Sequence, residues 1–268
     1  MAYSNALSST NSQYPAVWHV LAHTKTIKGR YNKLTLYIIL DVLLGLFCMV
    51  FGSWLTLYLY LCTIVLNVIF QIFFLRRALV NENIRWSKKY FFAVNIFLFY
   101  LCLVYLVTGL GTIWDIGLHD GVIRTSQIFL LPFNSSLYHW PYILNITMMI
   151  PLGFLLPFTW EQFRSITKVS LAGLFLSLLI ESSQLLNNRT TTVDDLIMNT
   201  LGAMVGYFIF KTLLYIVRKV KGKEIGFHFN NGASSRVIRY EGLCYIIFSF
   251  LGVLFFFNAP LFSRLMLW

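Results

Sequence analysis

Charged residues are scarce in this sequence. Asp, Glu, Lys and Arg make up 12% of the 268 residues, hydrophobic residues make up 58%, and the mean hydropathy is +0.70. A soluble domain of this length carries about 25% charged residues. The shortage excludes an ordinary water-soluble chain and favours an integral membrane protein, because apolar helices of about 20 residues can cross about 30 Å of hydrocarbon.

Other absences narrow the chemistry. The four cysteines all lie in apolar runs and form no CxxC pair, so neither a disulfide framework nor a zinc site is indicated. There is no HExxH signature and no nucleophile–base pair. Residues 1–33 are polar and lack a basic stretch followed by a short apolar core, so we expect an uncleaved anchor in place of a cleaved signal.

Seven apolar runs predict the fold class, an all-α polytopic membrane bundle of about seven transmembrane helices. The runs cover residues 34–51, 54–75, 90–111, 142–160, 169–186, 196–217 and 243–258. The first two are joined by Gly52 and Ser53, which indicates a tight hairpin. Pro151 and Pro157 interrupt the fourth run, so we expect a kinked or broken helix there, which neighbouring helices can support in a membrane.

The basic residues fall on alternate loops. Of the 21 Lys and Arg, 18 lie before the first run, after the second, after the fourth, or around the end of the sixth and beyond; the exceptions are Arg124, Arg189 and Arg264. The positive-inside rule therefore predicts a cytoplasmic N-terminus and an extracytoplasmic C-terminus. The same alternation argues against nucleic-acid binding despite the net charge of +11, because such loops set topology and contact anionic headgroups.

Polar residues inside or beside apolar runs are the functional candidates, because a carboxylate at the centre of a membrane helix costs about 2.5–3.5 kcal/mol. Glu181 and Gln184 share one helix face, and Asp195 and Asn199 share another at a spacing of four residues. Gly202 and Gly206, which follow, permit close helix packing. On the predicted topology the candidate ligand-binding residues all lie toward the outside: Arg124, Asn145, Glu181, Gln184, Arg189, Asp194, Asp195 and Asn199.

Structural roles explain some of these residues equally well. Thr192 and Asp195 have the spacing of a helix capping box. Glu181 could pair with Arg124 or Arg189 and hold the bundle together. Asn145 could make an interhelical hydrogen bond that has no ligand role.

Four stretches, in order along the chain, resemble the VanZ-like family, whose founder is associated with teicoplanin resistance. They are IFLLPF at 128–133, NITMMIPLGFLLP at 145–157, SLLIESSQ at 177–184 and VDDLIMNTLG at 193–202. One departure is Thr192, which stands where the family often has an acidic residue. The resemblance covers a core of four spans at 90–218. The apolar runs and the basic residues divide the rest into a polar cytoplasmic tail at 1–33, a two-span extension at 34–89, and a basic segment plus seventh span at 219–268.

What the resemblance implies about function is a phenotype, namely resistance to lipid-tailed glycopeptides. The first hypothesis is a non-enzymatic protein of a bacterial cell membrane that binds a lipid-linked cell-wall precursor or the drug at the outer leaflet, with Arg124 or Arg189 pairing with phosphate or carboxylate. Its expected partners are membrane lipids and such a ligand, without nucleic acid or a cofactor.

Two alternatives stay open. One is a membrane-embedded enzyme acting on a lipid or cell-wall precursor, with Glu181 as candidate catalytic acid or base and Asp194 and Asp195 as candidate metal ligands. The other is a lipid or proton-coupled transporter that uses a broken fourth helix as a hinge.

Overall fold

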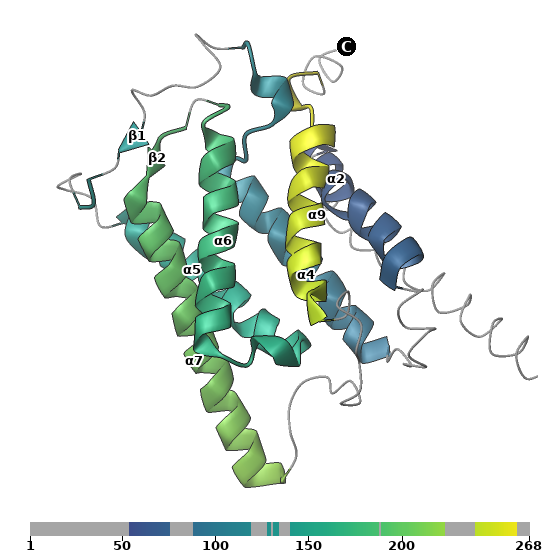
Figure 1. Cartoon of the computed structure of the whole chain (residues 1–268), viewed down its shortest axis with the longest axis vertical. Helices are drawn as coiled ribbons and strands as arrows, with labels where there is room; N and C mark the ends of the chain where they lie inside the picture. The colour runs from purple at the N-terminus through teal and green to yellow at the C-terminus, as the bar shows by residue number, and fades with distance from the viewer. Residues whose placement is uncertain are drawn as a thin grey trace, which may run out of the picture. The chain divides into compact units, whose positions relative to one another are not determined.

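The computed structural model describes residues 54–75, 88–118, 128–129, 131–133, 140–187, 189–222 and 239–261, all within the compact unit Gly45–Trp268. The described chain is almost entirely helical (Figure 1). Its elements are α2 (Trp54–Phe70), continued by the π-helical η1 (Gln71–Leu75), α4 (Lys88–Thr108), η2 (Ile113–Asp115), β1 (Ile128–Phe129), α5 (Trp140–Thr159), η4 (Glu161–Phe163), α6 (Ile166–Gln184), β2 (Thr191–Thr192), α7 (Val193–Lys221) and α9 (Glu241–Phe256). For these residues the predicted all-α membrane bundle is confirmed.

Five of these helices are long and apolar enough to cross a membrane. They are Trp54–Phe73, Lys89–Asp115, Trp140–Thr159, Ile166–Gln184 and Val193–Val220, and they match the second to sixth apolar runs. The run at 34–51 lies outside the described residues, and the run at 243–258 forms the shorter helix α9 of 16 residues. The count of seven spans and the orientation of the termini therefore stay predictions.

Helix directions alternate along the chain. The last turns of α4 and α6 lie together, because Gln184 Nε2 donates to the Thr108 carbonyl at 2.9 Å. The first turns of α4 and α9 lie together through Tyr90 and Glu241. Helices α4, α6 and α9 thus run one way and α2, α5 and α7 the other, as expected if each crosses the bilayer in turn. One end of the bundle then carries most of the described basic side chains, namely Lys89, Arg164, Lys168, Arg218 and Lys219.

Helices α5 and α7 run parallel and touch through their backbones. A Cβ on Gly202 would lie 2.3 Å from the Ile146 carbonyl oxygen, and one on Gly206 would lie 2.0 Å from that of Ile150. No side chain fits in that space, so only glycine allows this approach. The close packing predicted for Gly202 and Gly206 is confirmed.

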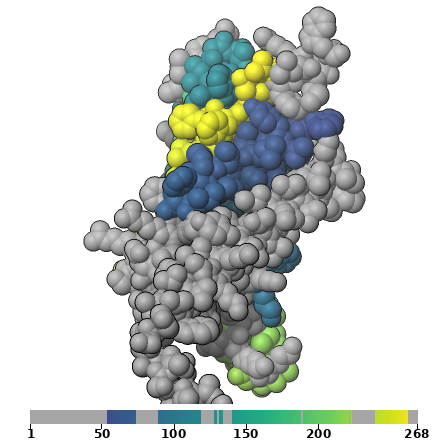
Figure 2. Space-filling model, turned by 90° about the vertical axis from the view of Figure 1, so that its right-hand side faces the viewer, coloured from purple at the N-terminus to yellow at the C-terminus, as the bar shows by residue number. Residues whose placement is uncertain are grey.

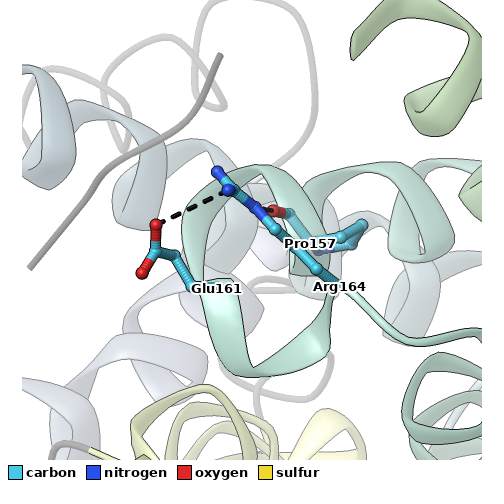
Figure 3. A network of polar contacts seen from close by, with 3 residues as sticks. All are labelled: Pro157, Glu161 and Arg164. Atoms are coloured by element: carbon cyan, nitrogen blue, oxygen red, sulfur yellow. Dashed lines mark hydrogen bonds and ion pairs between the residues drawn. The ribbon is translucent and has the colours of Figure 1, made fainter. Parts of the chain in front are cut away.

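Of the two outcomes predicted for the fourth run, a kink or a break, the break is not present. Helix α5 runs from Trp140 to Thr159 as one helix, with Pro151 and Pro157 inside it. Beyond its end, Arg164 Nε lies 3.5 Å from the Pro157 carbonyl oxygen and Arg164 Nη1 lies 3.5 Å from Glu161 Oε1 (Figure 3). A positive charge near the C-terminal carbonyl groups of a helix interacts favourably with the helix dipole. Arg164 therefore stabilises the C-terminal end of α5.

Helices α2 and α9 form a second close pair. Figure 2 shows α2 in blue lying along α9 in yellow. A Cβ on Gly252 would lie 2.1 Å from the Cys62 carbonyl oxygen, and the Phe70 and Tyr245 rings meet edge to face with centroids 5.6 Å apart.

A buried polar cluster joins α9 to the start of α4 and the end of α5. Tyr90 donates to Glu241 Oε2 at 2.5 Å, and Trp160 Nε1 donates to the Tyr90 hydroxyl at 3.0 Å. All three side chains are almost fully buried. These bonds offset part of the cost of burying a carboxylate.

Candidate functional site

A short strand pairing closes the end of the bundle opposite to the basic residues. Strands β1 and β2 are parallel, with Ile128 opposite Thr191 and Phe129 opposite Thr192. Helix α7 begins immediately after β2. The pairing therefore places the first VanZ-like motif, at 128–133, beside the start of the fourth.

The start of α7 contains only half of the predicted capping box. Thr192 Oγ1 accepts from the Asp195 backbone N–H at 3.1 Å, so the predicted N-cap is confirmed. In a capping box the Asp195 carboxylate would accept from the Thr192 N–H. Glu181 Oε2 accepts that N–H instead, at 3.2 Å. Glu181 thus links α6 to the start of α7, and the Asp195 carboxylate is left available for another partner.

That partner is on α5. Asn145 Nδ2 donates a hydrogen bond to Asp195 Oδ1. The interhelical hydrogen bond expected for Asn145 is therefore present, and it connects a third helix to the site. Both side chains are half-buried, so they are reached from outside the bundle.

The antiparallel register of α6 and α7 builds a ladder of facing residues. A Cβ on Gly173 would lie 2.7 Å from the Ala203 Cβ, and one turn further along Asn199 Nδ2 donates to Ser177 Oγ at 2.9 Å. The same register places Glu181 opposite Asp195 one turn further along, where both are linked to Thr192. Glu181 is only 5% exposed and is more buried than Asp195, which is half-buried.

Asp194 holds a loop, a role that the sequence did not predict. Its Oδ1 accepts from the Phe133 backbone N–H at 2.8 Å and its Oδ2 accepts from the Tyr142 hydroxyl at 2.7 Å. Phe133 has a φ of 59°, which is costly for a side chain of this size. The carboxylate thus stabilises a strained backbone, with the Phe133 and Tyr142 rings meeting edge to face.

Gln184 and Arg189 lie with the end of α4. Gln184 donates to the Thr108 carbonyl, and Asn187 Nδ2 donates to the Gly109 carbonyl at 2.9 Å. The Arg189 guanidinium is exposed and lies beside Gly109, where a Cβ would be 2.8 Å from Arg189 Nε. Within the described residues Arg189 forms no ion pair, so the predicted pairing of Glu181 with Arg189 is wrong.

Arg124, the other predicted partner of Glu181, lies outside the described residues. Among those described, no group of three or more His, Cys, Asp or Glu side chains is arranged to hold a metal ion. The structure therefore brings together four of the eight predicted binding residues in direct contact or on facing turns, namely Asn145, Glu181, Asp195 and Asn199.

The comparison with protein families decides the assignment. Residues 97–216 match the family model VanZ/LLP1. This segment is a VanZ-like domain. The resemblance predicted from the four motifs is confirmed, and the match lies within the predicted core at 90–218. No curated protein and no solved structure matches the chain.

Asn145, Glu181, Asp195 and Asn199, called the polar cluster from here on, all lie within the VanZ-like domain. Helices α2 and α9 lie outside it, and α4 begins before it. With five helices able to span a bilayer, the chain is a membrane protein that contains a VanZ-like domain. Two groups that donate to Asp194 were not predicted from the sequence, namely the Phe133 backbone N–H and the Tyr142 hydroxyl. The Pro–Phe motif was the available signal for Phe133.

Proposed function

We propose that the VanZ-like domain is a non-enzymatic binding module of a bacterial cell membrane. It binds the headgroup of a lipid-linked cell-wall precursor, or of a lipid-tailed glycopeptide, at the outer leaflet. Such binding lowers the access of teicoplanin-like drugs to their target. The observation that carries the proposal is that Glu181 of α6 and Asp195 of α7 are both linked to Thr192, while Asn145 of α5 donates to Asp195.

The position of this cluster supports a site for an amphiphile. It lies at the end of the bundle opposite to most of the described basic residues, which the positive-inside rule assigns to the cytoplasm. Beside it, Leu131 and Phe133 are 71% and 59% exposed. Asp194 connects these apolar residues to the first turn of α7. A polar cluster next to exposed apolar side chains suits a ligand with a polar head and an acyl chain.

A membrane-embedded enzyme is the second candidate, favoured by the facing carboxylates. Two carboxyl groups in different environments can act as acid and base, as in many hydrolases. Glu181 is buried and Asp195 is half-buried, so the pair meets that description. The transporter alternative loses its main support, because α5 has no break to serve as a hinge.

Resistance measurements test the binding proposal. A teicoplanin-susceptible bacterium that expresses the full chain is expected to grow at a several-fold higher drug concentration than the same bacterium without the chain. Glu181→Gln and Asp195→Asn are expected to remove this gain at equal membrane levels. Glu161→Gln removes one carboxylate at the other end of the bundle and is expected to keep it. Full resistance in the first two variants would exclude this site.

A separate assay tests the alternative that the domain is an enzyme. Purified chain is incubated with labelled lipid-linked cell-wall precursors, with and without Mg²⁺. We expect the precursors to be recovered unchanged. A new product that disappears with Glu181→Gln would replace the binding proposal by the catalytic one.

A further inference from the structure

The seam between α6 and α7 has more hydrogen-bond acceptors than donors. Glu181 and Asp195 supply four carboxylate oxygens, and the donors that reach them come from Thr192 and Asn145. No described cation pairs with either carboxylate. A ligand that fits this inventory has to bring donors or positive charge.

Asn199 adds an independent observation. The residue is 2% exposed, and its amide nitrogen donates across the seam to Ser177, which directs the side chain into the α6–α7 interface. Its Oδ1 is buried and accepts no hydrogen bond. An unsatisfied buried oxygen costs about 1–3 kcal/mol. It lies one helical turn from Asp195, on the same face, and so extends the acceptor-rich seam inward.

We propose that this seam binds a primary ammonium group, so that the amphiphile taken by the VanZ-like domain has a cationic amine in its head. This inference rests on the proposed function and specifies the headgroup. An ammonium has three N–H donors and no acceptor, which complements Glu181, Asp195 and the Asn199 Oδ1. A buried or half-buried ammonium–carboxylate contact is a charge-assisted hydrogen bond, the strong kind in proteins.

The same inventory disfavours an anionic head. A phosphate brings only acceptors and negative charge, and would lie against two carboxyl groups that offer it no donor. The described cation nearest in sequence, Arg189, is exposed beside Gly109 and belongs to the end of α4. A metal ion is less suited than an amine, since no group of three His, Cys, Asp or Glu side chains is formed among the described residues.

Binding of simple amphiphiles to the full chain tests the proposal. The chain is purified in an uncharged maltoside detergent and titrated with labelled dodecylamine, with dodecyl phosphate and with dodecyltrimethylammonium. We expect saturable binding of dodecylamine, at least ten-fold tighter than that of the phosphate. The trimethylammonium compound keeps the charge but has no N–H, so it is expected to bind several-fold more weakly than the amine.

Variants connect the binding to the seam. Glu181→Gln and Asp195→Asn are close in shape to the native residues and are each expected to weaken dodecylamine binding at least ten-fold. Glu161→Gln, which removes one negative charge elsewhere, is expected to leave it within two-fold. Competition by phosphatidylethanolamine against competition by a lipid-tailed glycopeptide then distinguishes a lipid amine from a drug amine.

Three results would overturn the inference. One is Glu181-dependent binding of dodecyl phosphate in preference to dodecylamine, which would leave the amphiphile-binding function standing and reverse the headgroup. Another is dodecylamine binding that appears only in Arg124→Ala, which would mean that the chain's own guanidinium fills the seam. The third is equal dodecylamine binding by native chain, Glu181→Gln and Asp195→Asn. Failure of the resistance assay, by contrast, would count against the proposed function itself.

Discussion

Glu181, near the end of α6, accepts the backbone N–H of Thr192 at the start of α7, at 3.2 Å. A capping box would have assigned this bond to Asp195, three residues beyond Thr192. Because Glu181 takes it, the Asp195 carboxylate turns to Asn145 of α5. The local signal for a helix start thus becomes a junction of three helices, and the polar cluster of the VanZ-like domain is built on it.

The cap itself is testable with Thr192→Ala. The substitution removes the hydroxyl that accepts the Asp195 N–H, so we expect a loss of about 1 kcal/mol in the free energy of unfolding. Thermal denaturation in detergent measures it, and exposed Thr190→Ala is the control, expected to be neutral. Equal melting temperatures for the two variants would mean that the cap contributes nothing.

Gly206→Ala tests the contact between α5 and α7. The new Cβ would lie 2.0 Å from the Ile150 carbonyl oxygen, so the helices have to separate, and we expect a destabilisation of about 3 kcal/mol or more. Leu201→Ala, on an exposed position of the same helix, is expected to change stability by well under half of that. A fluorescence-monitored size-exclusion profile after heating compares the two, and a native profile for Gly206→Ala would contradict the close approach.

Asp194→Ala is expected to release Phe133. The amide of Phe133 loses its acceptor, and its left-handed backbone loses the bond that holds it. Hydrogen–deuterium exchange of that amide is therefore expected to accelerate at least ten-fold. Tyr142→Phe keeps the carboxylate but removes one hydrogen bond, worth about 1 kcal/mol, so a smaller acceleration is expected. Unchanged exchange in both variants would remove Asp194 from its positioning role.

Tyr90→Phe tests the buried cluster that attaches α9. Removing the hydroxyl takes one donor from the Glu241 carboxylate and one acceptor from the Trp160 N–H, so we expect a loss of about 2–3 kcal/mol. Tyr240→Phe, at an exposed tyrosine one residue before α9, is the matched control. A melting temperature for Tyr90→Phe equal to that of the control would show that these bonds add no net stability.

Much of the bundle followed from local patterns. The apolar runs at 54–75, 90–111, 169–186 and 196–217 correspond to helices or to the helical pair α2 and η1, because an apolar stretch of that length has few other ways to satisfy its backbone in a membrane. The glycines of α7 predicted a close contact between helices because they have no side chain to hold a neighbouring backbone away. The prolines of α5 do not break the helix, as is common in membrane helices whose neighbours can satisfy the freed carbonyl groups.

The polar cluster shows the limit of such patterns. Sequence alone was enough to select Asn145, Glu181, Asp195 and Asn199 as costly residues in an apolar setting, and to place them near one membrane level. Only the tertiary structure decided their partners, turning Glu181 away from Arg189 and toward Thr192, and giving Asp194 to Phe133 and Tyr142. The physical reason is that the free-energy cost of burying a charged side chain depends on its residue type, which the sequence shows. The hydrogen bonds that offset this cost depend on the register between helices and on a strand pair whose members lie more than 60 residues apart.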